Sequence, residues 1–469
     1  MEESDMNYFK LLWELRSLKN NTKKTKIQME KLQKEKLSKI LHYAYDHSDY
    51  YRTAFMQAGI TKQTIDITPI SEFPSINKKE LIKHFDKLVT VDDVKQSELQ
   101  VFDELEDTED TFKNNYHVVH SSGSTGKPGY FIYDEQAWNH MLLGIIRGAL
   151  WDMSMWDILK LLWKTPRIVY IAACDGRYGG AMAVGSGIEG VRALQLSLDI
   201  KQPLDEWINQ IQKFKPSIVI GYSSAIKILA EQVSTGKVSV QIKRIISCGE
   251  PLNANLRSYL EQIFHCDIVN FYGASESLAL GVELHGEEGM YLFDDMNYIE
   301  VENGKMYLTS LYNYAQPLIR YELSDRLVFD ECDDHYPFSK IKNLAGRNED
   351  LMWFQNEQGT REFLHPLAIE GFCMEHMLDY QFIQKDEHSF ELDIEVSNEE
   401  YKDTIQKKMT TSITSMLKEK RLDYVEFAIS FVDEILPDNR TGKKRLIILE
   451  KKGARRGARQ EVRPGPLHH

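Results

Sequence analysis

A segment rich in Ser, Gly and Thr near residue 120 carries the densest group of residues able to bind phosphate. It reads HSSGSTGKPGYF, from His120 to Phe131. Glycines allow successive backbone N–H groups to converge, and hydroxyls and an ammonium donate charge-assisted hydrogen bonds to anionic oxygens. It is not a Walker A loop, because Pro128 follows Lys127 where that motif has Ser or Thr. The alternative is a surface turn of small residues. The phosphate-binding candidates are Ser122, Gly123, Ser124, Thr125, Gly126 and Lys127.

A second candidate segment, NFYGASES, follows an apolar run and spans Asn270 to Ser277. The ring of Tyr272 could stack on a purine, and the amide of Asn270 could meet an adenine amino group. Glu276 offers a hard oxygen ligand to Mg²⁺. Taken alone, a Tyr-Gly turn beside an exposed Glu is also typical of an ordinary strand end.

Three further segments place charged residues on turns. In PLIRYELSDRLVF, Asp325 closes a loop between two strand-like runs and could accept hydrogen bonds from both ribose hydroxyls. In AGRNEDLMWF, Arg347 opens a charged turn that could hold a nucleotide and also act as a hinge. In LPDNRTGKKRLI, Gly442 would set Lys443 on a tight turn before a strand. Each is also compatible with solvated surface.

The elements that must position these residues alternate between strands and helices. Residues 116–133 predict strand, loop, strand, and apolar runs at 167–173, 217–222 and 244–249 alternate with helical stretches. This order predicts an α/β fold, with a mixed, largely parallel sheet flanked by helices. From Met290 to Phe329 the period shifts toward two, which predicts an antiparallel or barrel-like subdomain.

The pattern divides the chain into a large and a small domain. We expect a large N-terminal domain over residues 1–345, beginning with amphipathic helices from Met6 to Phe55, and a hinge at 346–350. A compact C-terminal α+β domain follows at 351–449. Residues 450–469 predict a disordered basic tail, for which a vector-derived remnant and a natural basic arm are both open.

Composition excludes several classes of function. The chain has 57 Lys and Arg against 71 Asp and Glu, a net charge of −14, which argues against broad binding to nucleic acid or anionic membranes. Its five cysteines form no CxxC pair, as expected of reduced cytosolic thiols. No signal peptide or uninterrupted apolar span is recognisable. The sequence predicts a soluble, cytoplasmic monomer or homodimer.

The five segments, in this order and spacing, resemble the core motifs of the adenylate-forming superfamily of acyl-CoA synthetases, peptide-synthetase adenylation domains and luciferases. Within it the chain is similar to the compact branch typified by phenylacetate–coenzyme A ligase and capsule-biosynthesis ligases. Supporting segments are LHYAYDHSDYYRTAF (Leu41 to Phe55), FPSINKKEL (Phe73 to Leu81) and PLIRY (Pro317 to Tyr321). The resemblance spans roughly Leu41 to Leu449.

The resemblance implies a role for each matching residue in binding ATP. Ser124, Thr125 and Lys127 would lie in the loop that holds the β- and γ-phosphates, and Glu276 would bind Mg²⁺. The other implied nucleotide contacts, from adenine to ribose, are Gly249, Glu250, Pro251, Asn270, Phe271, Tyr272, Gly273, Ser275, Asp325 and Arg347.

The resemblance also implies a two-step reaction. Lys443 would bridge the carboxylate of the acid and the α-phosphate as an acyl-AMP forms, and the small domain would then rotate about Glu349 so that a thiol can reach the adenylate. The cofactors would be ATP and Mg²⁺, with coenzyme A or the phosphopantetheine of an acyl carrier protein as co-substrate. Amide or ester formation through the same acyl-AMP and a non-catalytic nucleotide-binding protein remain alternatives.

The acid is a small-molecule carboxylic acid whose pocket no motif marks. Position in the family points to IAACDGRYGG and GYSSAI as linings, and tyrosines there favour an aryl or arylacetic acid. A plain surface loop is an equal alternative for Asp175 and Arg177. The pocket candidates are Asp175, Arg177, Tyr178, Tyr222, Ser223 and Ala274.

The chain departs from the family pattern in three places. The usual Thr of the Tyr-Gly-x-Thr-Glu motif is Ser275 here, which keeps the hydroxyl. The usual Tyr-Arg-Thr-Gly-Asp is YELSD here, which keeps Asp325 but changes the loop before it. Some relatives hold a structural zinc, yet Leu284 and Tyr291 stand at the likely ligand positions. Cys332 with His335 is too little for a tetrahedral site. We therefore predict no zinc site.

Overall fold

The computed structural model falls into two compact units. Unit 1 comprises residues 1–348 and 370–373, and unit 2 comprises residues 349–369 and 374–469. The structure describes residues 3–450 except 105–110, 122–127, 175–178, 186–192, 285, 304, 324, 331–334, 346–350, 356–358, 360, 366–368, 370, 371, 373, 375 and 437–444. The roles expected of a hinge and a mobile domain stay predictions, because the hinge at 346–350 lies outside these residues.

Unit 1 begins with helices, as the three- and four-residue apolar spacing predicts. A capping box fixes the start of the second helix: Thr25 and Gln28 each accept a hydrogen bond from the other's backbone N–H. The elements are α1 (Glu3–Asn21), α2 (Lys26–His47), α3 (Asp49–Gln57), η1 (Ile70–Glu72), α4 (Lys78–Leu88) and α5 (Gln96–Glu104).

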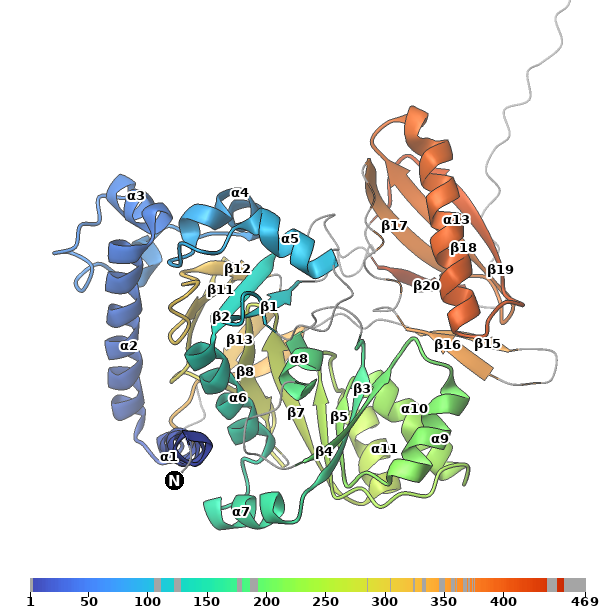
Figure 1. The fold of residues 1–469 in the computed structure, drawn as a ribbon, viewed down its shortest axis with the longest axis horizontal. Coiled ribbons are helices and arrows are strands. Elements are labelled where there is room, and N and C mark those ends of the chain that lie inside the picture. Colours follow the sequence, from blue (N-terminus) through green and yellow to red (C-terminus); the bar gives the residue numbers. More distant parts are fainter. Residues whose placement is uncertain are drawn as a thin grey trace, which may run out of the picture. The chain divides into compact units, whose positions relative to one another are not determined.

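A nine-stranded mixed sheet forms the centre of unit 1 (Figure 1). Its order is β13-β14-β9-β8-β7-β6-β5-β3-β4, parallel from β4 to β7 and antiparallel from β7 to β13. The strands are β3 (Arg167–Ala172), β4 (Leu194–Asp199), β5 (Ile218–Gly221), β6 (Arg244–Cys248), β7 (Asp267–Ala274), β8 (Ser277–Glu283), β9 (Met290–Leu292), β13 (Arg326–Asp330) and β14 (Lys340–Ala345).

Helices flank this sheet, which confirms the predicted α/β class. α6 packs on β7 and β8, while α10 contacts β3, β5 and β6 and α11 contacts β7. Asp134 and Asn253 cap α6 and α11 through their side-chain oxygens. The helices are α6 (Glu135–Ala149), α7 (Met155–Trp163), α8 (Gly179–Gly185), α9 (Leu204–Phe214), α10 (Ser223–Ser234) and α11 (Ala254–Phe264).

Two small antiparallel sheets complete unit 1. The antiparallel pairing expected from Met290 to Phe329 is present, but it is divided, because β9 and β13 extend the large sheet. The remaining strands form the pair β1-β2 and the sheet β10-β11-β12. They are β1 (Tyr116–His120), β2 (Tyr130–Asp134), β10 (Asn297–Glu302), β11 (Lys305–Ser310) and β12 (Tyr321–Leu323).

Unit 2 is a small α+β body. Its four-stranded sheet has the order β19-β18-β17-β20, and a separate pair is β15-β16. Strand β18 covers the apolar alternation of FELDIEV, where period two predicts a strand. The elements are β15 (Met352–Gln355), β16 (Arg361–Leu364), β17 (Met377–Gln384), β18 (Ser389–Val396), η2 (Glu399–Tyr401), α13 (Lys402–Glu419), β19 (Glu426–Val432) and β20 (Ile447–Leu449).

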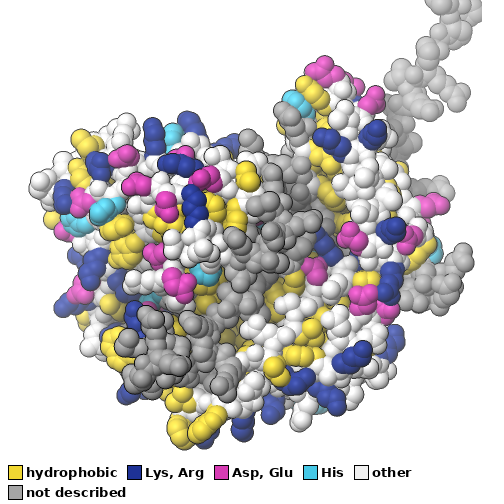
Figure 2. All heavy atoms as spheres, viewed as in Figure 1, with side chains coloured by type: hydrophobic (Ala, Val, Ile, Leu, Met, Phe, Trp, Pro, Cys, Tyr) yellow, Lys and Arg dark blue, Asp and Glu magenta, His cyan; other side chains and the backbone are white. Residues whose placement is uncertain are grey.

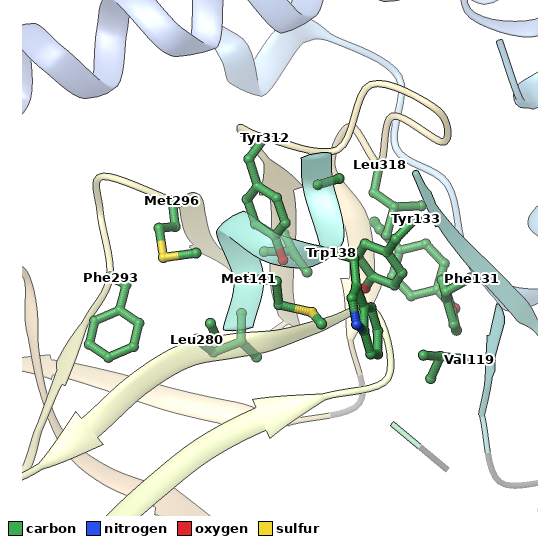
Figure 3. Packing of buried hydrophobic residues seen from close by; sticks show 14 of the residues in the cluster. Val119, Phe131, Tyr133, Trp138, Met141, Leu280, Phe293, Met296, Tyr312 and Leu318 are labelled. Atoms are coloured by element: carbon green, nitrogen blue, oxygen red, sulfur yellow. The ribbon is translucent and has the colours of Figure 1, made fainter. Parts of the chain in front are cut away.

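The core of unit 1 joins α6 to the strands around it. Trp138 and Met141 of α6 lie among side chains from β1, β2, β8 and the 311–318 segment, as Figure 3 shows. Tyr133 packs edge-to-face on Trp138, with ring centroids 5.7 Å apart. This contact anchors β2 to the large sheet through α6.

The surface mixes both signs of charge. Figure 2 shows acidic and basic side chains interspersed over the visible face. Among the helices that the structure describes, none is long and apolar enough to cross a bilayer.

A buried ion pair ties α1, α2 and α6 together. Arg147 of α6 contacts Asp295 at 2.6 Å, and both side chains are fully buried. Asn21 donates to the same carboxylate at 2.7 Å, and Lys36 donates to the Asp295 carbonyl at 2.6 Å. Burial alone would raise the pKa of Asp295, yet these neighbours lower it. The guanidinium also lies 4.3 Å from the ring centroid of Phe293.

Removing the arginine should leave an unpaired buried carboxylate. We expect Arg147→Met to lower the free energy of unfolding of unit 1 by about 3–5 kcal/mol, measured by urea denaturation. Lys62→Met, which breaks an exposed pair with Asp46, is the control and should cost about 0–1 kcal/mol. Equal losses in the two variants would contradict a structural role for the buried pair.

Candidate active site

The turn between β7 and β8 stands where the large sheet changes from parallel to antiparallel. Ala274 pairs with Ser277, so Ser275 and Glu276 form the turn. A Cβ on Gly273 would lie 2.4 Å from the Leu278 carbonyl oxygen, so this position requires glycine. Ligands of open α/β sheets bind at the carboxyl ends of parallel strands, which is where this turn lies.

Tyr272 and Asp325, 53 residues apart in sequence, meet beside this turn. The Tyr272 hydroxyl donates to Asp325 Oδ2 at 2.8 Å. Burial and the Asp325 charge raise the pKa of the Tyr272 hydroxyl well above its usual value. The structure thus brings together the two residues expected at the purine and the ribose. The carboxylate of Asp325 keeps further lone pairs for other donors.

Glu276 is a half-buried carboxylate on the same turn. Burial raises its pKa to about 7, and the negative charge of Asp325 contributes to this rise. A hydrogen bond from the Tyr321 hydroxyl and the charge of Lys78 act in the opposite direction. A bound cation would favour the ionised form of Glu276, which burial and the nearby negative charge disfavour.

Tyr321 and Lys78 are site residues to which the sequence patterns assigned no role. Tyr321 begins β12, and Lys78 begins α4 directly after the FPSIN segment. Ile76 of that segment pairs with Tyr321, through backbone bonds to Arg320 and Glu322. Both residues lie in segments that carry the family resemblance, so the resemblance could have identified them.

Strand β2 holds the turn in place. The hydroxyl of Tyr133 donates to the Glu276 carbonyl at 3.0 Å and lies 3.3 Å from the Ser275 carbonyl oxygen. In return, Ser275 Oγ donates to the carbonyl of His120, at the end of β1, at 3.2 Å. Two reciprocal contacts therefore link the β7–β8 turn to the β1–β2 pair.

The β1–β2 pair carries the predicted phosphate-binding residues between its strands. It is antiparallel, with His120 opposite Tyr130, which confirms the predicted strands on either side of the loop. Ser121 N donates to the Gly129 carbonyl, and Gly129 N donates to Ser121 Oγ, each at 2.9 Å. Residues 122–127 themselves lie outside the described part of the chain.

Gly249, Glu250 and Pro251 lie against the start of α10. Gly249 has φ +77°, and a Cβ there would lie 2.7 Å from the ring of Tyr222. Glu250 accepts from Ser224 N at 2.9 Å and from Ser223 Oγ at 3.2 Å, so its carboxylate caps the helix. Residues expected at the adenine and in the acid pocket thus form one cluster.

Two of the expected nucleotide contacts on β7 have other partners. Asn270 Nδ2 donates to Glu283 at 2.8 Å across the hairpin, which leaves the carbonyl oxygen as its possible contact with an adenine amino group. The Phe271 ring packs on Phe293 and on Gly148 of α6. Because side chains alternate along a strand, it points away from the Tyr272 side. Any nucleotide contact of Phe271 would come from its backbone.

The predicted absence of zinc and several predicted site residues concern positions outside the described part of the chain. Within the described ranges, no three His, Cys, Asp or Glu residues gather as a metal cage. His335 and Lys340 instead pair with Glu287, at 2.9 and 3.1 Å. The absence of zinc stays a prediction, because Cys332 is outside those ranges. The same holds for the predicted roles of Asp175, Arg177, Tyr178, Arg347, Glu349 and Lys443.

Comparison with known proteins found a matching family model and relatives that align with most of the chain. The family model described as AMP-binding enzyme matches residues 53–297. Protein CapK of Staphylococcus aureus is 22% identical over 448 residues, covering 89% of this chain and 88% of CapK. Phenylacetate-coenzyme A ligase of Escherichia coli (strain K12) is 22% identical over 380 residues, 75% of this chain and 77% of the ligase.

A solved structure shares the fold. 2-Hydroxyisobutyryl-CoA ligase, in complex with 2-HIB-AMP and CoA, aligns with a TM-score of 0.58 and 18% identity. The alignment covers 92% of this chain and 91% of the ligase. At this identity the likeness concerns the fold alone.

The raised pKa of Glu276 predicts a pH-dependent cost to stability. Because the folded pKa, about 7, exceeds the ordinary 4.5, the folded protein loses stability as pH rises from about 4.5 to about 7, where the unfolded chain has released this proton and the folded chain still holds it. The Glu276→Gln variant stays neutral at this position. We therefore expect its Tm to rise relative to that of the wild type as the pH increases from 5 to 8. Differential scanning fluorimetry across this range measures the change.

A second group with a raised pKa is present in both the wild type and the variant, so its contribution cancels in the comparison. Burial also raises the pKa of Asp294 to about 7, and this group is unchanged by the substitution. The difference between variant and wild type therefore isolates Glu276. A Tm difference that stays constant from pH 5 to pH 8 would contradict the raised pKa.

Proposed function

Because the chain belongs to the AMP-binding enzyme family, the adenylate-forming superfamily, we propose that it activates a carboxylic acid with ATP and Mg²⁺ and passes the acyl group to a thiol. In the first step a carboxylate oxygen bonds to the α-phosphorus of ATP while the bond to pyrophosphate breaks. In the second step the thiol attacks the acyl carbon and AMP leaves. The acceptor is coenzyme A or a carrier-bound phosphopantetheine.

The observation that carries the proposal is the convergence of Tyr272, Asp325 and Glu276 at one turn. Tyr272 offers a fixed ring for adenine, since its hydroxyl is held by Asp325. The remaining lone pairs of Asp325 would accept the ribose hydroxyls. Glu276 would hold Mg²⁺ together with phosphate oxygens and water, the usual ligand set for this ion.

Bound Mg²⁺ would neutralise phosphate charge during the transfer. The chain's own residues supply position and further charge. Ser122 to Lys127 would hold the β- and γ-phosphates, and Lys443 would bridge the carboxylate and the α-phosphate. Arg347 would hold the ribose with Asp325, and Glu349 would act as the hinge between the half-reactions. Catalysis is then chiefly the positioning of two anions.

We infer an aryl or arylacetic acid as the substrate. Two relatives are named phenylacetate-coenzyme A ligase, from Escherichia coli and Thermus thermophilus. Tyr222 is buried against Gly249, beside Ser223, and could pack an aromatic ring. Ala274, which is small and half-buried, would line the same pocket.

The test is pyrophosphate release from ATP and Mg²⁺ with a panel of aryl, arylacetic, fatty and amino acids. We expect release that depends on one acid class, and a loss of about 10²–10³-fold in kcat for Glu276→Ala and for Lys443→Ala, because each removes charge stabilisation at the phosphates. Glu35→Ala and Lys31→Ala, at an exposed pair on α2, are the controls and should keep full activity.

The outcomes separate the steps of the proposal. Coenzyme A, a phosphopantetheinylated carrier protein and an amine, each added with the active acid, identify the acceptor by the product formed. Tight ATP binding with no release for any acid would argue for a non-catalytic nucleotide-binding protein and against the proposed reaction.

A further inference from the structure

We propose that Asp103 is a positioning residue for phosphate binding, acting through His120 and Tyr130. The inference rests on the proposed function, in which residues 122–127 hold the β- and γ-phosphates. It adds a carboxylate that touches no substrate but fixes the positions of the strands on either side of those residues.

One carboxylate from α5 holds both strands. His120 Nδ1 lies 3.0 Å from each oxygen of Asp103, and the Tyr130 hydroxyl donates to Oδ2 at 3.2 Å. His120 and Tyr130 are direct partners across the β1–β2 pair. Because a carboxylate only accepts hydrogen bonds, Nδ1 must carry a proton, which fixes the orientation of the ring.

The clamp lies next to the ends of the phosphate-binding segment. The pair Ser121–Gly129, which closes that segment with two hydrogen bonds, directly follows the pair His120–Tyr130. The His120 carbonyl also accepts from Ser275 Oγ, beside Glu276. A shift of His120 would therefore move both the Ser121–Gly129 pair and the turn that bears the proposed Mg²⁺ ligand.

The location of Asp103 favours positioning over simple fold stability. A carboxylate beside a site for a polyanion repels that ligand, so its charge by itself would weaken phosphate binding. The side chains of His120 and Asp103 are only 16% and 13% exposed, which shields their contact from water. If Asp103 supports phosphate binding, as we propose, its effect on geometry exceeds this electrostatic cost.

The test compares ligands with and without the outer phosphates. We expect Asp103→Ala to weaken binding of Mg·ATP and of pyrophosphate about tenfold, the loss of a hydrogen bond to a charged group. Binding of AMP, which lacks those phosphates, should stay within twofold. Isothermal titration calorimetry measures all three. Asp103→Asn keeps one acceptor for His120 and should restore part of the affinity.

Matched variants keep the result interpretable. Asp66→Ala breaks a second His–Asp contact of 3.0 Å, with His42, at an exposed site on α2, and should change no affinity. His120→Ala should match Asp103→Ala, and the double variant should be no weaker than either single variant. A general folding defect would instead lower AMP binding as well.

Two results would overturn the inference, and both differ from a failure of the proposed function. Unchanged or tighter ATP binding by Asp103→Ala would show that repulsion outweighs positioning. Equal losses for ATP and AMP would show a purely structural role. If the wild-type protein binds neither ATP nor pyrophosphate, the proposed function itself fails.

Discussion

The contact between the Tyr133 hydroxyl and the carbonyls of the β7–β8 turn constrains the rest of the site. Tyr133 also packs edge-to-face on Trp138 of α6, so it connects the turn to the hydrophobic core of unit 1. Tyr272, Ser275 and Glu276 take their positions from this turn. Gly273 allows the close backbone approach that the hairpin requires.

The charges at the turn are arranged for a partner of opposite sign. Burial and the negative charge of Asp325 raise the pKa of Glu276, and the hydrogen bond from the Tyr321 hydroxyl offsets this rise only in part. Such a preorganised group of like charges gains most when a cation enters it. In the proposed function, this arrangement would lower the stability of the free protein and favour binding of the cation.

The division into two units matters for the proposed reaction, because the proposed roles are divided between them. Glu276, Tyr272 and Asp325 belong to unit 1, while Lys443 falls within the range of unit 2. A reaction in two steps with different nucleophiles can use one nucleotide site if the small unit supplies different residues at each step. Glu349, the first residue of unit 2, is where such a change would pivot.

The sequence by itself determined the α/β class, the strands on either side of the segment proposed to bind phosphate, and the family. Periodicity and ordered motifs encode these locally, within about a dozen residues each. Only the tertiary structure decided that Tyr272 meets Asp325, that Tyr321 and Lys78 act on Glu276, and that Asp103 clamps His120 and Tyr130. It also assigned Glu250 to the cap of α10 and turned Phe271 toward α6. These contacts join different strands and helices, and their partners depend on strand order and register, which no local pattern of side chains specifies.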